Sequence, residues 1–252
     1  IAPQGIIVAD NGDVYVVDMA KEVFKVKKIR NFGIRKFKQM NNDGAVSYAY
    51  DLEFSETQEI TTVMRKSEGM AISENQKTIF IAEEKPQVGQ FGNVSKKRYV
   101  AAFNLEDGRF LDRLIGVTMN NDSIVSGYFN DSVEGICTFG NNLFVVDEKA
   151  GQFYIFDIRS GKYKGSIGKK AYYYCNYKSD CVIDGINYNE HSIIAGLAKP
   201  HLKNDWRKNE LASPDGISAI TLADGSSRLA VVDQWNSRIL VYDLDRVLQN
   251  IE

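Results

Sequence analysis

Apolar residues recur along this chain in pairs of short runs that are joined by turn residues. The stretch EGMAISENQKTIFIAEE, residues 68–84, shows the design: an acid–glycine pair, an apolar run, a polar turn, and a second apolar run that ends on Glu83 and Glu84. Such runs, bounded by turn residues, predict two antiparallel strands joined as a hairpin. Because a hairpin brings its two ends together, we expect the acids of the unit to share one face.

The hairpin pattern occurs five times, which indicates a repeat protein. The other four copies are QGIIVADNGDVYVVD at 4–18, VEGICTFGNNLFVVDE at 133–148, IDGINYNEHSIIAG at 183–196 and PDGISAITLADGSSRLAVVD at 214–233. Two copies are followed by a second hairpin of similar sequence, FNLEDGRFLDRLIG at 103–116 and FDIRSGKYKGSIG at 156–168. Four antiparallel strands per repeat are typical of the blades of a β-propeller.

We therefore expect an all-β fold, a single β-propeller domain over residues 1–252 with four-stranded antiparallel blades. The acid–glycine motifs give five blades, whereas the chain length divided by about 42 residues per blade gives six. We slightly favour six, with residues 31–67 as a degenerate blade. Helical patterns are confined to residues 199–211 and to the tail around Val247.

Composition excludes few functions. The net charge of −2 gives no general argument for nucleic acid or a membrane surface, and no apolar run reaches the roughly 18 residues of a membrane helix. Basic residues interleaved with Val, Ile and Phe between Lys21 and Lys38 could contact nucleic acid, but we favour the solvated face of outer strands. We expect a monomer.

Cysteines and sequons bear on the location of the protein. Cys175 and Cys181 could form a disulfide in a loop, and both states stay open, whereas Cys137 lies in an apolar strand and is expected to be buried. The chain opens at Ile1, so a removed leader is an open alternative. Three Asn-X-Ser sequons suit an exported protein, and we expect a secreted or periplasmic location. These sequons begin at Asn93, Asn121 and Asn130.

Acidic residues mark one end of each predicted hairpin. Four of them open first strands, the strands that line the central channel of a propeller, and others close second strands at the same mouth. Clustered carboxylates need a cation or protons, and an all-oxygen set suits calcium. The alternative is ordinary turn chemistry, in which each acid is solvated. The opening acids are Glu68, Glu134, Asp184 and Asp215, and the closing acids are Asp18, Glu83, Asp147 and Asp233.

The motifs resemble known propeller families. QGIIVADNGDVYVVD and SSRLAVVDQWNSRILVYDL are similar to NHL and SMP-30-type repeats, and EGMAIS…IFIAEE followed by VEGI and IDGI resembles the six-bladed β-propeller phytases over roughly residues 45–196. Ser132 stands where that family usually has Asp. The resemblance implies calcium ligands at Glu68, Glu83, Glu84, Glu134 and Asp184, to which the repeat adds Asp215.

Two functions of different class follow. The phytase-like interpretation implies a calcium-dependent phosphoester hydrolase, or a lactonase-like enzyme, acting on a small or phosphorylated substrate at the acidic mouth. Lys66, Lys85 and Lys149 flank the acids and are our candidates for gripping phosphate. The alternative is a non-catalytic NHL-type propeller that binds a protein or carbohydrate partner over the same face, and fold alone does not choose between them.

Overall fold

The computed structural model consists of small antiparallel sheets arranged as the blades of a β-propeller. It contains four blades among the residues that it describes. The described residues are 3–18, 33–56, 66–84, 98–120, 123–129, 132–170, 181–183, 186–188, 210–234 and 238–251.

Each blade is a meander in which consecutive strands pair. Blade 1 contains β1 (Pro3–Val8), β2 (Val14–Asp18), β3 (Gly33–Asn42) and β4 (Ala45–Tyr50). Blade 2 contains β5 (Ser67–Ile72), β6 (Thr78–Glu83), β7 (Tyr99–Asn104) and β8 (Phe110–Ile115). Blade 3 contains β11 (Val133–Phe139), β12 (Asn142–Asp147), β13 (Gln152–Asp157) and β14 (Tyr163–Lys170). Blade 4 contains β18 (Pro214–Thr221), β19 (Ser227–Asp233) and β20 (Arg238–Asp243).

Shorter elements decorate the blades. Strand β17 (Glu210–Leu211) pairs in parallel with the end of β14 and adds a fifth strand to the sheet of blade 3. The remaining elements are α1 (Leu52–Glu56), the hairpin of β9 (Val117–Asn120) and β10 (Ser123–Gly127), the hairpin of β15 (Cys181–Ile183) and β16 (Ile186–Tyr188), and α3 (Leu244–Gln249).

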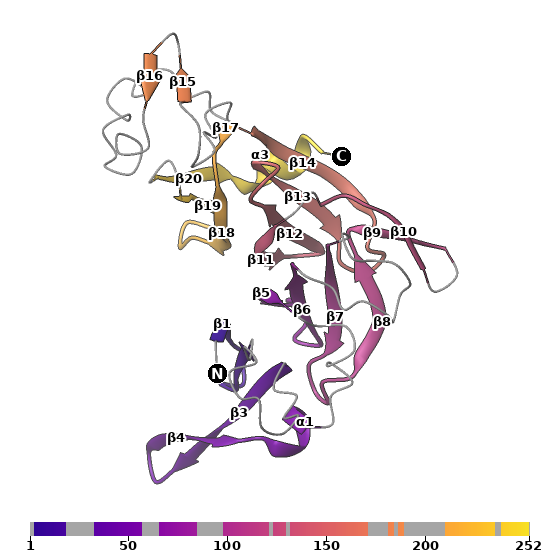
Figure 1. Cartoon of the computed structure of the whole chain (residues 1–252). Helices are drawn as coiled ribbons and strands as arrows, with labels where there is room; N and C mark the ends of the chain where they lie inside the picture. The colour runs from indigo at the N-terminus through magenta and orange to yellow at the C-terminus, as the bar shows by residue number, and fades with distance from the viewer. Residues whose placement is uncertain are drawn as a thin grey trace.

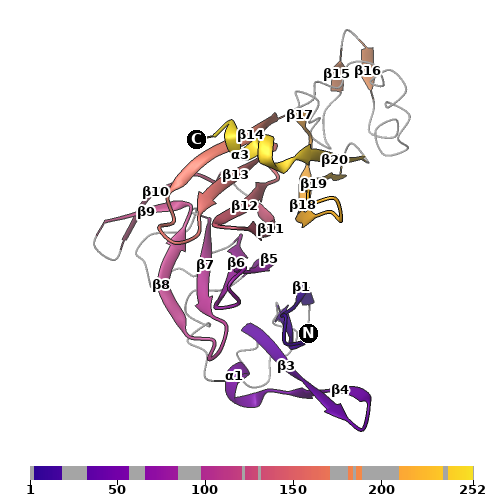
Figure 2. The ribbon, with the colours of Figure 1, turned by 180° about the vertical axis from the view of Figure 1, so that it is seen from behind.

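The first strands of the four blades lie side by side on the inner side of an arc. Strand β1 packs beside β5, β5 beside β11, and β11 beside β18. Figures 1 and 2 show this arc from its two faces, with β1 and β18 at its ends and β4, β8 and β14 toward the outside. The first strand of each of the four described blades is therefore the inner strand, as the sequence predicts.

The expected degenerate blade at residues 31–67 is wrong. Strands β3 and β4 lie in that range, and they follow β2 in the same sheet as the third and fourth strands of blade 1. Apolar side chains on β3 explain this placement, because Ile34 is fully buried against the neighbouring blade. The count of six blades stays a prediction, since the described residues contain four.

The fourth acid–glycine repeat gives no blade among the described residues. Its Asp184 lies outside them, and β18 of the fifth repeat packs directly beside β11 of the third. The predicted helix at 199–211 is contradicted at its end, where Glu210 and Leu211 form β17. The predicted helix around Val247 is confirmed as α3, whose N-cap Asp243 accepts a hydrogen bond from the Arg246 amide.

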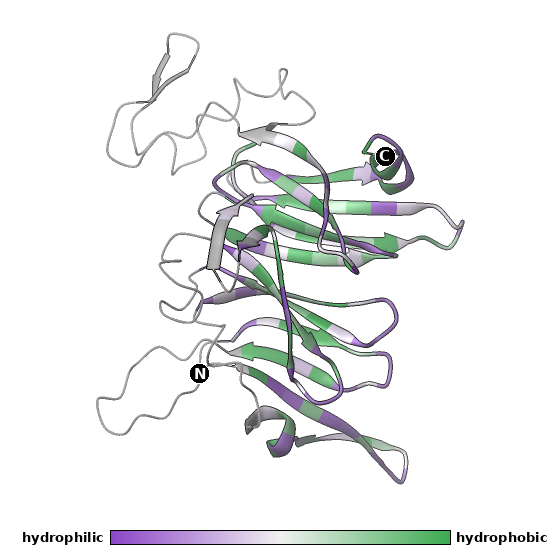
Figure 3. Ribbon diagram, turned by 90° about the vertical axis from the view of Figure 1, so that its right-hand side faces the viewer, coloured by the Kyte–Doolittle hydropathy of each residue, from purple (hydrophilic) through white to green (hydrophobic). Residues whose placement is uncertain are grey.

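Apolar clusters fill the seams between neighbouring blades. Tyr15 and Phe103 are buried between blades 1 and 2, Phe80 and Phe156 between blades 2 and 3, and Phe144 with other residues between blades 3 and 4. Figure 3 shows the apolar positions along the strands and the polar ones at the turns. Among the described residues, blades 2 and 3 are thus covered on both faces and blades 1 and 4 on one face, which is how a propeller forms a core without helices.

The glycines of the acid–glycine pairs let the inner strands meet backbone to backbone. A Cβ added to Gly69 would overlap the carbonyl oxygen of Glu134, and one added to Gly135 would lie 2.5 Å from the carbonyl oxygen of Asp215. Pairing of the first and second strands is interrupted at these pairs in blades 2, 3 and 4, as in a β-bulge. Glycine is needed here because any side chain would separate the two inner strands.

We expect Gly69→Ala to lower the free energy of unfolding by about 2 kcal/mol or more, because the added methyl group meets rigid backbone. Gly5→Ala is the matched control, since its Cβ would lie 3.2 Å from the carbonyl oxygen of Glu68. We expect a change of less than about 1 kcal/mol for this control. Urea unfolding of both variants measures the difference, and equal stability would contradict the close approach.

Candidate functional site

The acids that end the second strands close their own hairpins. Glu83 has no exposed surface, and its carboxylate accepts hydrogen bonds from the Lys66 amide at 2.7 Å and the Ser67 hydroxyl at 3.0 Å. These donors lie where the first strand of the same hairpin begins. Glu83, which the sequence proposes as a calcium ligand, therefore holds the two ends of its hairpin together.

The equivalent acids of blades 3 and 4 are buried in the same way. Asp233 accepts hydrogen bonds from the amides of Ala212 and Ser213, at 3.0 and 3.1 Å, and forms an ion pair with Arg238 at 2.9 Å. Asp147 is also fully buried and accepts from the Ala150 amide at 2.9 Å. The side chain of Asp18 lies outside the described part of the chain. A buried carboxylate that accepts backbone N–H bonds is a structural group.

The backbone of the residue after the closing acid bonds to the residue that precedes the first strand. The amides of Glu84 and Glu148 donate to the carbonyl oxygens of Lys66 and Ser132, at 2.9 and 3.0 Å. Their side chains then join the charged groups at the mouth of the inner strands. The equivalent residue of blade 4 is Gln234, whose amide bonds the carbonyl oxygen of Ser213 at 2.9 Å.

Five carboxylates and one ammonium group form the acidic mouth, at the end of the hairpins opposite their turns. Lys66 is the positive group, and its ammonium forms ion pairs with Glu84 and with Glu68, the latter at 2.6 Å. The Ser132 hydroxyl donates to Glu134 at 2.5 Å, and the Ser213 hydroxyl donates to Glu148 at 2.6 Å. The five acids of the acidic mouth are Glu68, Glu84, Glu134, Glu148 and Asp215.

Burial and mutual repulsion shift the titration of two of these acids. The pKa of Glu134 is raised to about 7, chiefly by burial and in addition by the charges of Glu68 and Glu148, while the Ser132 hydrogen bond and Lys66 act in the opposite direction. Burial, followed by the charges of Glu148 and Glu68, also raises the pKa of Asp215. Among the described residues, the acidic mouth therefore holds more negative charge than Lys66 offsets.

The carboxylates of the acidic mouth are suitable ligands for a hard cation, but they are not arranged as a preformed metal site. Carboxylate oxygens are the ligands that calcium prefers. Among the described residues, however, no group of three or more His, Cys, Asp or Glu side chains is arranged so that it could hold a metal ion. Of the predicted ligands, the structure brings Glu68, Glu84, Glu134 and Asp215 to the acidic mouth, buries Glu83 beneath it, and leaves Asp184 outside the described residues.

The three predicted phosphate-binding lysines have different surroundings. The ammonium group of Lys66 is committed to two glutamates, so in this arrangement it offsets their charge. Lys149 is exposed in the turn after β12, and Lys85 lies outside the described residues. Their role in gripping phosphate stays a prediction.

The sequence analysis did not propose Glu148 as a site residue. The signal was present, because Glu148 follows Asp147 as Glu84 follows Glu83. Cys137 is confirmed as a strand residue that packs against the apolar seam between blades 3 and 4, and burial raises the pKa of its thiol to about 12. Its thiol is therefore protonated at neutral pH and a poor nucleophile.

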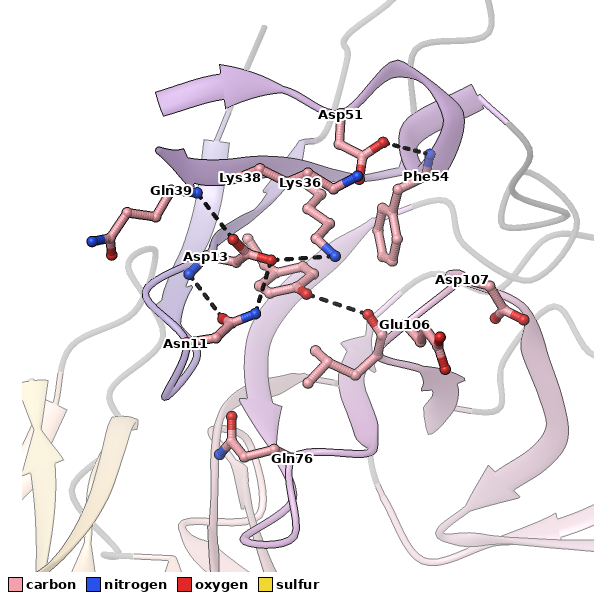
Figure 4. Close-up of polar contacts among 12 residues, drawn as sticks. Asn11, Asp13, Lys36, Lys38, Gln39, Asp51, Phe54, Gln76, Glu106 and Asp107 are labelled. Atoms are coloured by element: carbon pink, nitrogen blue, oxygen red, sulfur yellow. Dashed lines mark hydrogen bonds and ion pairs between the residues drawn. The ribbon is translucent and has the colours of Figure 1, made fainter. Parts of the chain in front are cut away.

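A second polar cluster lies at the opposite, turn end of blades 1 and 2 (Figure 4). Asp13 forms a buried ion pair with Lys36 at 3.3 Å and accepts hydrogen bonds from the Asn11 side chain and the Gln39 amide. The Lys36 ammonium also lies over the rings of Tyr15 and Phe54, at 5.4 and 5.2 Å. The expectation that the basic run forms a solvated face is therefore wrong for Lys36, which is 7% exposed.

Comparison with known proteins supports the fold alone. No protein-family model and no curated protein matches the chain. It is similar to Kuenenia stuttgartiensis hydrazine synthase, with a TM-score of 0.50 and 13% identity over 99% of this chain and 55% of that chain. The neighbours are propeller-type proteins, in agreement with the arrangement of blades described above. The similarity identifies this chain as a β-propeller protein and carries no function with it.

Two further matches are more distant. A Bacteroides uniformis protein provisionally assigned as a 6-phosphogluconolactonase gives a TM-score of 0.43 and 12% identity, over 92% of this chain and 49% of that chain. A nidogen/laminin complex gives a TM-score of 0.38 and 14% identity, over 66% of this chain and 47% of that chain. The chain spans about half the length of the solved structures that it matches. No described helix is long and apolar enough to cross a membrane.

The two acid positions of blade 2 should respond differently to mutation. We expect Glu83→Gln to lower the free energy of unfolding by about 2 kcal/mol, because a buried acceptor of backbone and hydroxyl donors loses its charge. Glu84→Gln keeps the shape of its side chain and should cost less than about 1 kcal/mol, since Lys66 retains Glu68. Urea unfolding compares the two, and a larger loss for Glu84→Gln would reverse our assignment of their roles.

The raised pKa of Glu134 predicts a pH dependence of stability. Unfolding returns this carboxyl from about 7 to its ordinary value of 4.5. The folded state therefore binds more protons between these pH values, and stability falls as pH rises through that window. Because the group is only partly buried, we expect a loss of about 1 kcal/mol between pH 5 and pH 7.5. Glu134→Gln should flatten this slope in urea unfolding with EDTA present, and an unchanged slope would contradict the assignment.

Proposed function

We propose that this propeller binds a cation at the acidic mouth, with calcium as the ion. The observation that carries the proposal is the excess of carboxylates over positive charge, where Glu68, Glu134, Glu148 and Asp215 act on one another through space. A divalent cation would relieve this repulsion more strongly than the single ammonium of Lys66 does.

The residues that would hold calcium come from three neighbouring blades. Glu68 belongs to blade 2, Glu134 and Glu148 to blade 3, and Asp215 to blade 4. Bound calcium would thus link the inner strands at the end where their hairpins are closed. We place Lys66 as the internal competitor of the ion, because its ammonium already forms ion pairs with two of the glutamates. Calcium has to displace this ammonium from Glu68 before that carboxylate becomes a ligand.

We further propose that the protein hydrolyses a phosphoester, an activity that would depend on the calcium site. Calcium bound at the acidic mouth would supply positive charge for the oxygens of a phosphate group. The chain itself would contribute Lys66, whose ammonium a bound ion displaces from Glu68, as a nearby cation for the same group. The carboxylates then act as ligands, and a general base is not assigned.

A second function is favoured by the ion pairs of Lys66. The supporting observation is the Lys66 ammonium held between Glu68 and Glu84, because a basic side chain of a partner could form similar ion pairs. A non-catalytic propeller could bind a partner protein here through a Lys or Arg of that partner. Titration of a lysine-rich peptide in the absence of calcium tests this alternative, and binding should weaken steeply with added salt.

Thermal unfolding with EDTA and then with excess calcium tests the cation site. At a calcium concentration of about 100 times its Kd, we expect the midpoint to rise by about 5 °C. Glu68→Gln combined with Glu134→Gln should abolish the rise. The matched control combines Glu74→Gln with Glu106→Gln, two exposed glutamates outside the acidic mouth, and should keep it. No rise in the wild type with millimolar calcium would reject the cation site.

Two further measurements separate the functions that the site could serve. Lys66→Met should tighten calcium binding by about tenfold, because the internal competitor is removed. Turnover of p-nitrophenyl phosphate that needs calcium and is lost in the Glu68→Gln, Glu134→Gln variant would support the hydrolase. Calcium binding without turnover of phosphoesters would reject the hydrolase and leave a cation-binding interaction module.

A further inference from the structure

A pocket lies between blades 2 and 3 at the turn end of the hairpins, the end opposite the acidic mouth. Its volume is about 390 Å³, within the range of sites that bind small molecules. The β5–β6, β11–β12 and β13–β14 turns surround it, and β8 supplies one side. We call it the turn-side pocket. None of the residues of the acidic mouth lines it.

One wall of the turn-side pocket carries a fixed arginine. Arg113 of β8 is half-buried, and its Nη1 donates to the carbonyl oxygen of Ile158 in blade 3 at 2.9 Å. The pairing of β7 with β8 is interrupted immediately before it, where Asp112 has a φ of 50°. Bulges of this kind re-aim a side chain next to a site, and a strained φ at a residue other than glycine marks a position held by its surroundings.

A second arginine lies on the same pocket, in the β13–β14 turn. Arg159 is exposed, and Asp157 fixes its backbone by accepting from the Arg159 amide at 3.1 Å. Within the described part of the chain, no carboxylate forms an ion pair with the guanidinium of Arg113 or Arg159, although Glu74 also lines the pocket. The described lining therefore carries two guanidinium groups and one carboxylate, which leaves a net positive charge.

The remaining lining combines neutral hydrogen-bonding groups with an apolar floor. Asn75, Asn141 and Thr78 offer amide and hydroxyl groups, while Phe80 and Ile158 are almost completely buried. Two arginines with planar sets of donors suit the oxygens of a phosphate or carboxylate, and the amides suit hydroxyl groups. The arrangement requires a ligand that is both anionic and polar along its length.

We propose that the turn-side pocket binds a small organic oxyanion, a phosphate monoester or a carboxylate that also carries hydroxyl groups. Arg113 and Arg159 hold the anionic group between them, and the side chains of Asn75, Asn141 and Thr78 contact the hydroxylated part. This site is independent of the acidic mouth, because it uses other residues at the other end of the hairpins and needs no calcium.

Isothermal titration calorimetry in EDTA tests the proposal with three probes: glycerol 3-phosphate, citrate and glycerol. We expect glycerol 3-phosphate or citrate to bind with a Kd of about 1 mM or tighter and glycerol not to bind. The tighter of the two anions identifies the group, phosphate or carboxylate, that the arginines prefer. Binding of neither anion at concentrations up to about 10 mM would overturn the proposal.

Arginine variants locate the binding. Arg159→Met should weaken the tighter anion by about tenfold and leave the melting temperature unchanged, because its side chain is exposed. Arg113→Lys keeps the charge but loses the planar set of donors, and should weaken it by a similar factor. Arg109→Met is the matched control, an exposed arginine of the β7–β8 turn that does not line the pocket. Equal affinity in all variants, or equal losses in Arg159→Met and Arg109→Met, would overturn the site.

Discussion

The close approach of neighbouring inner strands is the constraint on which the rest of this structure depends. At Gly69 and Gly135 there is no space for a side chain, because the backbone of the next blade fills it. The acid before each glycine is consequently fixed at the inner edge of its blade, next to the acids of its neighbours. The acidic mouth therefore results from the same packing that joins the blades. The repulsion among its carboxylates opposes that packing.

A buried carboxylate ends the second strand of blades 2, 3 and 4 and stabilises this arrangement. Glu83, Asp147 and Asp233 accept amide hydrogen bonds from the chain of their own hairpin or of the turn that follows it. These donors satisfy the buried charge and hold the hairpin ends in place, so that Glu84 and Glu148 can extend into the mouth. The two adjacent acids thus have different roles: the first stabilises the hairpin, and the second lies in the acidic mouth.

Much of the fold could be predicted from the sequence, because the residues that form each hairpin are close together in the chain. The turn glycines, the apolar runs and the position of the first strand at the inner edge all follow from local pattern. The pairing of β3 with β2 could not be predicted so directly, since residues 19–32 separate these strands. The burial of Lys36 could not be predicted either, because the alternation of basic and apolar residues around it fits a solvated face. Its burial is favourable only because the rings of Tyr15 and Phe54 and the carboxylate of Asp13 surround its ammonium. Likewise, the sequence places Glu83 and Glu84 at the same strand end but does not distinguish their roles. The structure distinguishes them, because the backbone amide of Lys66 donates to Glu83, whereas the ammonium of Lys66 pairs with Glu84.

The short strand β17 joins the outer edge of blade 3 just before the chain enters blade 4. Lys169 and Lys170 pair in parallel with Glu210 and Leu211, so the chain leaves blade 3 and returns to it at the same edge. A parallel connection needs only about a dozen residues, far fewer than separate these strands. This pairing places residues 210–211 at the outer edge of blade 3, immediately before β18 begins the inner edge of blade 4. Blade 4 is therefore attached to blade 3 by backbone pairing just before β18, in addition to the packing of β18 beside β11.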